Sequence, residues 1–351
     1  MAKTPKVWGV TTPQLPASMI AAMARQMEDS GLTGVFAPQV LGPPFIPLAA
    51  AATSTSSLQL ASGIALAFAR SPFETAMAAI DLDRMSGGRF VLGLGPSVKA
   101  WSEALFGQPY GKPLAHLREV IDVVRLIVAK GHTGELTRYD GDYVSIDFTF
   151  FPPQEPPPRT EIPIWIAALR GPLVKLGAEI ADGVIGHPIW SRRWIAEQVP
   201  GWLDEGLARV GRSRDDIEVN IWPFIAIDDD VQAAIDTARP TVAFYASAEQ
   251  YESYFEWHGW GDVARQLHER VGQGDMRSGK IVEVAALVPD EMVREFFILG
   301  SRDECLAQLE PIWDVADSIT PVPPTWGTDM GGILQYTGRI AEALYPGATT
   351  A

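Results

Sequence analysis

The sequence predicts an α/β protein of the (β/α)8 TIM-barrel class with insertions. Short apolar segments alternate with amphipathic segments along most of the chain, which is typical of a parallel sheet covered by helices. A complete β-α-β unit lies between residues 58 and 99. The length of 351 residues is enough for two average domains or for one large α/β barrel, and the repeated alternation favours the barrel. We therefore expect residues 1–351 to form a single barrel domain.

The β-α-β unit has clear boundaries in the sequence. Residues 58–66 (LQLASGIAL) form a short apolar segment that is typical of a strand buried on both faces. Ser71, followed by Pro72 and by Glu74 three residues after the serine, predicts a helix start with a capping box. The Gly-Gly pair at 87–88 predicts the helix end, and FVLGLG predicts the next strand. The two strands should be parallel with a right-handed crossover.

The other elements repeat this alternation. Strands are expected at 6–11, 34–37, 163–168, 183–188, 218–227 and 317–322. Helices are expected at 16–30, 46–53, 114–129, 172–181, 192–210 and 331–345.

Two segments depart from the pattern. Residues 131–161 alternate polar and apolar residues and then become proline-rich, which predicts a β-hairpin and an extended tail inserted at the barrel rim. Residues 230–315 predict a helical excursion longer than one crossover requires. A doubly wound sheet is the competing fold. The turn after its first strand would normally carry a glycine-rich phosphate motif, whereas this turn reads TTPQLP.

Composition limits the class of partner. The 28 basic and 43 acidic residues give a net charge of −15, which argues against nucleic acid and anionic membranes as partners. The single cysteine, Cys305, forms no internal disulfide and suits a reducing compartment. The start of the sequence lacks the apolar core of a signal peptide, and no apolar run approaches the ~20 residues of a membrane span. We expect a cytoplasmic protein that acts on a small molecule.

Several catalytic motifs are missing. The sequence contains no H-E-x-x-H, C-x-x-C, G-x-S-x-G or G-x-x-x-x-G-K-[ST], which argues against zinc hydrolases, serine hydrolases and P-loop proteins. The Gly93-x-Gly95 pair has Val98 in place of a third glycine, so we interpret it as a tight strand exit and not as a dinucleotide site. No metal site is predicted.

Function in such a barrel is expected at the carboxyl ends of the strands. The residues at these ends are mostly small or apolar and include no clear acid–base pair. They are Thr11, Thr12, Gln39, 63–67, 95–99, 168–171 and 186–188. Backbone amides and flat apolar surface suit a planar cofactor that supplies the reactivity itself.

A phosphate site is predicted between a strand and the helix at 172–181. Ala168, Leu169, Arg170 and Gly171 precede this helix, whose free N–H groups and dipole favour an anion. Gly186 and His187 end the next strand. The alternative is an ordinary loop with a surface arginine. His187 could donate to a phosphate or a substrate, or be a structural histidine, and we interpret the other four histidines as structural.

Two long blocks resemble a known family. SGIALAFARSPFETAMAAIDLDRMSGGRFVLGLG resembles the core signature of the bacterial luciferase-like flavin oxidoreductases. IPIWIAALRGPLVKLGAEIADGVIGHP resembles the phosphate-binding segment of that family. The resemblance covers most of the chain, excluding residues 131–161 and 240–300. Within the superfamily, the sequence is most similar to the branch that uses the deazaflavin coenzyme F420.

This resemblance implies a cofactor ring near the strand ends and a homodimer. It also implies a non-proline cis peptide behind the ring, at Gly63-Ile64 or at Ile64-Ala65. The residues implied to bind the cofactor are Gly63, Ile64, Ala65, Ser97, Ala168, Leu169, Arg170, Gly171, Gly186 and His187. We expect Gly171→Asp to weaken cofactor binding without changing the stability of the apoprotein.

One departure from the family concerns proton transfer. Gln39 and Pro43 stand where related deazaflavin proteins commonly place an acidic residue or a histidine. Lys99 is then the nearest ionisable candidate, unless it is a surface lysine. The candidate catalytic residues are therefore Gln39, Lys99 and His187. The expected function is hydride transfer between F420 and an organic substrate; the alternatives are an FMN-dependent monooxygenase and a non-catalytic cofactor-binding paralogue.

Overall fold

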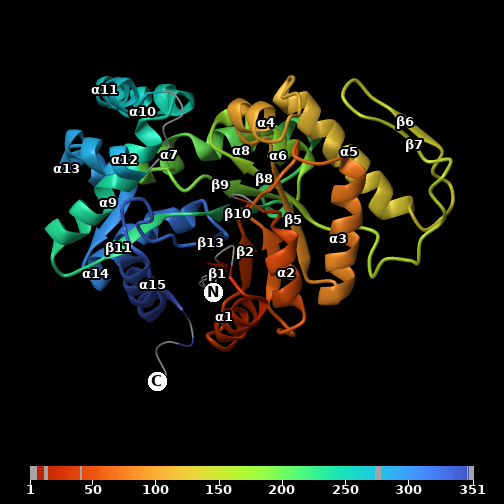
Figure 1. Ribbon diagram of the computed structural model, residues 1–351, viewed down its shortest axis with the longest axis horizontal. Helices are drawn as coiled ribbons and strands as arrows, with labels where there is room; N and C mark the ends of the chain where they lie inside the picture. The colour runs from red at the N-terminus through yellow and green to blue at the C-terminus, as the bar shows by residue number, and fades with distance from the viewer. Residues whose placement is uncertain (1–5, 12–14, 40–41, 273–277, 346, 348–351) are drawn as a thin grey trace. The chain divides into compact units, whose positions relative to one another are not determined.

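The computed structural model describes residues 6–11, 15–39, 42–272, 278–345 and 347. Thr12, one of the predicted strand-end residues, lies outside them. The chain divides into two compact units, which are described separately (Figure 1). The first unit contains Met1–Gly186 and Gly201–Asn220, and the second contains His187–Pro200 and Ile221–Ala351.

The first unit is built on seven parallel strands that are almost entirely buried. In hydrogen-bonded order they are β10 (Glu218–Ile221), β9 (Gly183–Gly186), β8 (Ile164–Ala168), β5 (Phe90–Gly95), β3 (Gln59–Ser62), β2 (Gly34–Ala37) and β1 (Lys6–Val10). The short strand β4 (Ala65–Leu66) also pairs with β5. Three aromatic rings from β1, β2 and β8 contact one another with centroids 4.6–6.0 Å apart, those of Trp8, Phe36 and Trp165.

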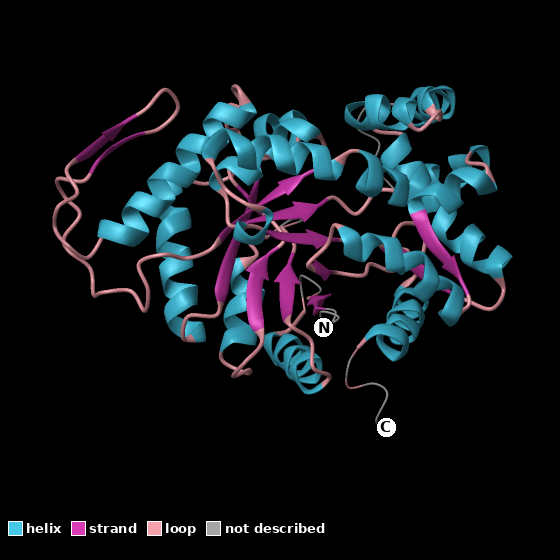
Figure 2. Cartoon of the chain, turned by 180° about the vertical axis from the view of Figure 1, so that it is seen from behind, coloured by secondary structure: helices cyan, strands magenta, loops and turns pink. Residues whose placement is uncertain are grey.

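Helices follow the strands and cover the sheet (Figure 2). They are α1 (Ala17–Asp29), α2 (Phe45–Ala52), α3 (Pro72–Ser86), α4 (Lys99–Ala104), α5 (Pro113–Lys130), α6 (Gly171–Ile180) and α8 (Val199–Val210). Helix α3 starts and ends as the sequence predicts. The Ser71 side chain accepts a hydrogen bond from the Glu74 N–H, and Gly87 closes the helix at φ 67°.

Residues 131–161 contain an antiparallel hairpin of β6 (Arg138–Asp140) and β7 (Ser145–Asp147). The segment is attached to helix α3 by an ion pair between Arg159 and Asp83, whose charged groups are 2.6 Å apart. The Asp83 side chain is completely buried, and Arg159 contacts both of its carboxylate oxygens. The buried carboxylate therefore depends on this arginine.

The second unit is mainly helical. Its strands are β11 (Phe224–Ile227) and β12 (Phe297–Gly300), which pair in parallel, and β13 (Ser318–Ile319). Its helices are α7 (Arg192–Glu197), α9 (Val231–Ala246), α10 (Glu252–Trp257), α11 (Gly261–Val271), α12 (Ser278–Val284), α13 (Asp290–Phe296), α14 (Arg302–Leu309) and α15 (Met330–Leu344). Among the described residues, no helix has the length and apolar character needed to cross a membrane.

Four expected elements differ from the structure. The strand expected at 58–66 is interrupted between β3 and β4, and the strand expected at 218–227 is divided into β10 and β11. Pro223 lies at the second break, where its missing N–H ends the ladder. The helix expected at 192–210 is divided into α7 and α8, and the segment expected to be helical at 230–315 also contains the strand β12.

Candidate functional site

The interruption between β3 and β4 is a cis peptide bond between Gly63 and Ile64. It lies at one of the two positions that the family resemblance implied. Both residues are half-buried, whereas Ala65 is fully buried. The Gly63 N–H donates to the carbonyl of Ala37 at the end of β2 (2.8 Å). The bulge is therefore fixed by its neighbouring strand and still has accessible surface.

Strand β5 fits beside the bulge because it carries glycines there. A Cβ atom on Gly93 would lie 1.9 Å from the Ser62 carbonyl oxygen, and one on Gly95 would lie 2.4 Å from Cδ1 of Ile64. The Ser62 hydroxyl also donates to the Gly93 carbonyl (2.8 Å). The Gly-x-Gly pair thus permits the close approach of two strands, which explains it without a dinucleotide site.

Gln39, a predicted catalytic residue, is buried and connects β2 to the bulge. Its N–H donates to the Ile64 carbonyl (3.2 Å), and its side-chain oxygen accepts from the Leu66 N–H (2.9 Å). The same oxygen accepts from Arg70 (3.0 Å), whose guanidinium lies over the Phe45 ring. Burial lowers the pKa of Arg70. These contacts hold Gln39 between β2 and the bulge, and its partner Arg70 was not among the predicted site residues.

Ser97, a predicted cofactor-binding residue, follows β5 and has a left-handed backbone. Its φ of 60° is positive, which is unusual for a residue other than glycine. This conformation costs about 1 kcal/mol. The Tyr110 hydroxyl donates to the Ser97 carbonyl (3.0 Å). Burial raises the pKa of Tyr110, although the charge of Arg170 opposes the shift. Tyr110 therefore stabilises this turn as a neutral donor.

The predicted phosphate residues of the first unit gather at the ends of β8 and β9. Ala168 and Gly186 are register partners in adjacent strands. Helix α6 begins immediately after Arg170, which is exposed, and its first intrahelical donors are Leu173 and Val174. Both donate to the Arg170 carbonyl and Pro172 has no N–H, so the amide that this turn can offer an anion is that of Gly171. Leu169 is half-buried between the strand end and this helix.

Gly171 has a packing role that the sequence did not reveal. A Cβ atom at this position would lie 2.7 Å from the indole ring of Trp202 in α8. Gly171→Asp would therefore disturb the packing of α6 on α8 as well as any bound anion. The expectation that this substitution leaves the stability of the apoprotein unchanged is wrong.

Lys99 is the first residue of α4, and its side chain is 70% exposed. Its ammonium group lies 3.9 Å from the Glu103 carboxylate, one helical turn away. This is the arrangement of a surface lysine. It gives no support to a role in proton transfer.

His187 belongs to the second unit and is half-buried. Its Nδ1 accepts from the Ile189 N–H (3.2 Å), which leaves the proton of the neutral ring on Nε2. Nε2 lies 3.2 Å from the Tyr251 hydroxyl, and the Tyr245 ring lies edge-on. Burial lowers the pKa of His187 to about 4. The residue is therefore a neutral donor at neutral pH and not a cation for a phosphate.

A second histidine of this unit, His258, forms a buried network. Its Nδ1 donates to the Tyr254 carbonyl, and its Nε2 accepts from the Ser191 hydroxyl, both at 2.8 Å. The Ser191 hydroxyl also accepts from the Trp194 N–H and caps α7. Burial lowers the pKa of His258 to about 4. Ser191 is only 1% exposed, so this serine–histidine pair is structural and not a nucleophile with its base.

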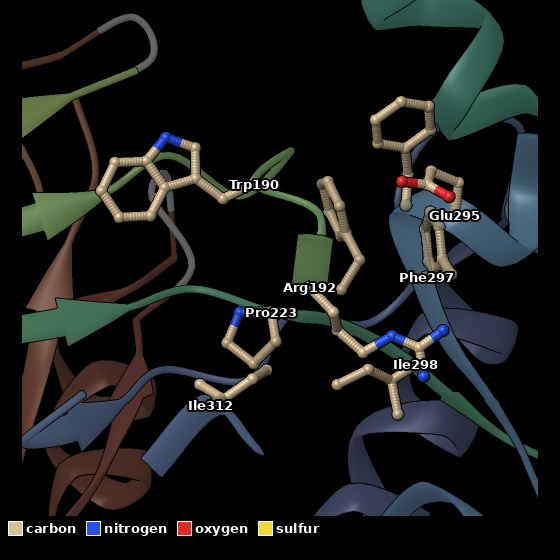
Figure 3. Close-up of a pocket in the computed structure, with 9 residues that line it drawn as sticks. Trp190, Arg192, Pro223, Glu295, Phe297, Ile298 and Ile312 are labelled. Atoms are coloured by element: carbon tan, nitrogen blue, oxygen red, sulfur yellow. The ribbon is translucent and has the colours of Figure 1, made fainter. Parts of the chain in front are cut away.

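Two cavities within the units do not suit a cofactor. The one in the second unit (Figure 3) has a volume of about 10 Å³, enough for one water molecule. The Glu295 carboxylate lines it beside Arg192. The cavity in the first unit has about 510 Å³ but is lined by Pro163 and Ile164 at the start of β8. Active sites of these barrels lie at the opposite ends of the strands.

Comparison with known proteins identifies the family. A family model described as luciferase-like monooxygenase matches residues 4–314. The chain belongs to the luciferase-like monooxygenase family. A Mycobacterium tuberculosis relative, named "Putative coenzyme F420-dependent oxidoreductase", is 35% identical to this luciferase-like protein over 329 residues, covering 88% of this chain and 90% of the relative. The family assignment made from the sequence is confirmed.

Solved structures of luciferase-like proteins share the fold. The coenzyme F420-dependent tetrahydromethanopterin reductase of Methanopyrus kandleri has a TM-score of 0.79 and 25% identity, with 98% of this chain and 99% of that chain covered. An FMN complex of a type II Baeyer–Villiger monooxygenase from Pseudomonas putida has a TM-score of 0.66 and 14% identity, covering 99% and 98%. The predicted (β/α)8 barrel class is confirmed. Because the Baeyer–Villiger monooxygenase is only 14% identical, the similarity to it concerns the fold alone.

Proposed function

We propose that this protein is an oxidoreductase that transfers a hydride between coenzyme F420 and a small organic substrate. The observation that carries the proposal is the partly accessible, uncharged surface of Gly63 and Ile64 at the carboxyl end of β3, in a chain whose relatives include proteins named as F420-dependent. When bound, the cofactor would accept the hydride at C5 of its ring in the oxidised form and donate it from C5 in the reduced form. The protein then has to bind, orient and desolvate the reactants.

The residues of the first unit fit such a group. Gly63 and Ile64 offer uncharged, partly accessible surface for one face of a flat ring, and Gln39 fixes their peptide groups from the side. The first turn of α6 offers the Gly171 amide to a phosphate, and Arg170 supplies the positive charge. Ala168 and Gly186 bring no bulky side chain to this edge. The apolar bulge and the anion-binding turn correspond to the two ends of a deazaflavin nucleotide.

Titration with F420 and with FMN tests the proposal. Fluorescence should show F420 binding tighter than FMN binding, followed by reduction or oxidation of F420 with a panel of small alcohols, ketones and enones. Tighter binding of FMN, with oxygen consumption by the reduced form, would instead favour a monooxygenase. Binding of F420 without turnover on any substrate would favour a non-catalytic paralogue.

Arg170→Gln tests the phosphate end separately. A charge-assisted hydrogen bond contributes about 1.5–3 kcal/mol, so the variant should bind F420 roughly 10- to 100-fold more weakly and with less dependence on salt. Arg138→Gln on the exposed hairpin is the matched control and should bind normally. Equal affinity of Arg170→Gln and the wild type would remove this loop from the site.

We further propose that the protein is a cytoplasmic homodimer. Light scattering coupled to size exclusion would give about 76 kDa for two chains of 38.2 kDa. A mass of one chain at micromolar concentration would contradict the dimer.

A further inference from the structure

The turn of the hairpin insertion is held by one carboxylate of α5. Glu119 accepts three backbone hydrogen bonds at 2.9–3.0 Å, from the N–H groups of Asp142, Tyr143 and Val144. A Cβ atom on Gly141 would lie 2.3 Å from a Glu119 carboxylate oxygen, so this approach needs glycine. The hairpin is therefore attached to α5 at a fixed point, although β6 and β7 themselves are largely exposed (Figure 1).

This attachment places the Tyr143 ring in a stack of aromatic rings. Tyr143 stacks on His116 with centroids 4.8 Å apart, and His116 stacks on Phe68 with centroids 3.9 Å apart and an interplanar angle of 3°. Phe68 follows β4 and meets the Tyr110 ring edge-on at 5.7 Å. Tyr143 also packs against Gly111, where a Cβ atom would lie 2.8 Å from its ring.

The stack ends at the loop that follows β5. His116 Nδ1 lies 3.4 Å from the Tyr110 carbonyl, and the Tyr110 hydroxyl donates to the carbonyl of the left-handed Ser97. A continuous series of contacts thus joins the hairpin turn to a candidate cofactor-binding turn that lies about 45 residues earlier in the sequence. Glu119 attaches the hairpin turn to α5, and Tyr143 connects the turn to the stacked rings.

We propose that the hairpin insertion is a brace for the loop after β5, holding Ser97 in its binding conformation through Tyr143 and Tyr110. The effect on cofactor affinity rests on the proposed function. Tyr110, Tyr143 and Glu119 are positioning residues. The insertion is then part of the site without containing a residue that touches the cofactor.

Hydrogen–deuterium exchange of the full-length apoprotein tests the brace without any cofactor. In Tyr143→Leu and in Glu119→Ala, amides 142–144 and amides 97–99 should both exchange at least tenfold faster than in the wild type. Tyr110→Phe should accelerate only amides 97–99. Arg138→Gln, on the exposed side of the hairpin, should leave both segments unchanged. Acceleration confined to 142–144 in the first two variants would overturn the proposal.

Fluorescence titration with F420 supplies the second measurement. Tyr143→Leu and Tyr110→Phe should raise the Kd for F420 at least tenfold, and Tyr143→Phe, which keeps the ring, should restore it. A wild-type Kd for F420 in both Tyr143→Leu and Tyr110→Phe would overturn the effect on affinity. If the wild type itself fails to bind F420 while amides 97–99 respond as stated, the proposed function fails and the brace is supported.

Discussion

The bulge at Gly63-Ile64 in the first unit and the buried histidines His187 and His258 in the second unit are both uncharged at neutral pH, but for different physical reasons. Around Gly63-Ile64 the protein uses glycines, backbone amides and a glutamine that cannot titrate. In the second unit it uses His187 and His258, which can titrate but which burial keeps neutral above a pKa of about 4. The bulge residues themselves are uncharged by composition, with the Arg70 guanidinium held beside Gln39, whereas the two histidines are uncharged because of their environment.

This difference indicates where the reactivity has to come from. Gly63, Ile64 and Gln39 have no titratable side chain, and the pKa values of His187 and His258 lie at about 4, below the range near neutrality in which a general acid or base works best. Such a protein suits chemistry supplied by a bound cofactor. The four substitutions or conditions that follow test each side of the contrast, beginning with the largest expected effect.

Gly93→Val should damage the first region most. Its Cβ would lie 1.9 Å from the Ser62 carbonyl oxygen, which is backbone and cannot swing aside. Overpacking of this kind should lower the free energy of unfolding by about 3 kcal/mol or more, as measured by urea denaturation. Gly201→Ala is the control, because a Cβ there meets nothing within 4 Å. Normal stability of Gly93→Val would mean that β5 does not approach the bulge this closely.

Acid should destabilise the second region through His258. Its pKa is about 4 in the folded protein and 6.5 as a free side chain, so between these values the unfolded chain binds the extra proton. Stability is therefore full above pH 6.5 and is lost as the pH falls towards 4, by about 3 kcal/mol for this residue. Denaturation of the wild type and His258→Gln at pH 7, 5.5 and 4.5 measures it. Parallel curves would mean that His258 is not kept neutral.

Gln39→Leu should remove the acceptor shared by the Leu66 N–H and Arg70. Unsatisfied buried donors cost about 1–3 kcal/mol each, so the free energy of unfolding should fall by about 2 kcal/mol and F420 binding should weaken. Gln39→Glu keeps an acceptor beside Arg70 and should be nearly as stable as the wild type. If Leu and Glu behave alike, the hydrogen bonds are not what fixes the bulge.

Lys99→Met should change least. The exposed side chain pairs only weakly with Glu103, and such pairs contribute about 0–1 kcal/mol. The kcat with F420 and the melting temperature should stay close to those of the wild type. A 100-fold loss of kcat with normal F420 binding would restore Lys99 as the acid and would end the contrast drawn above.

Most of the fold could be predicted because its signals are local. The Ser71 cap of α3, the glycine that ends this helix and the apolar strands each occupy a few consecutive residues. The two divided strands could not be predicted from the same signals. Pro223 marks the break between β10 and β11, but the strand that β11 then pairs with, β12, lies about 70 residues away in the sequence.

The candidate site could be predicted only in part for the same reason. The cis bond at Gly63-Ile64 followed from a family signature, and Gln39 was singled out because it departs from the family pattern. Tyr110, Arg70 and Glu119 had no signal, because their partners lie at distant positions such as Ser97 and Tyr143. An isolated tyrosine in a loop, or an isolated glutamate in a helix-forming stretch, looks like any surface residue.

The lone thiol of Cys305 has a practical consequence. It is 2% exposed, its Sγ lies 3.5 Å from the Gly300 carbonyl, and burial raises its pKa to about 12. Maleimide and iodoacetamide reagents attack thiolates, so the native chain should give almost no background labelling. A cysteine introduced on the hairpin would then carry a single fluorophore or spin label, and the motion of that segment could be followed without first removing the natural residue.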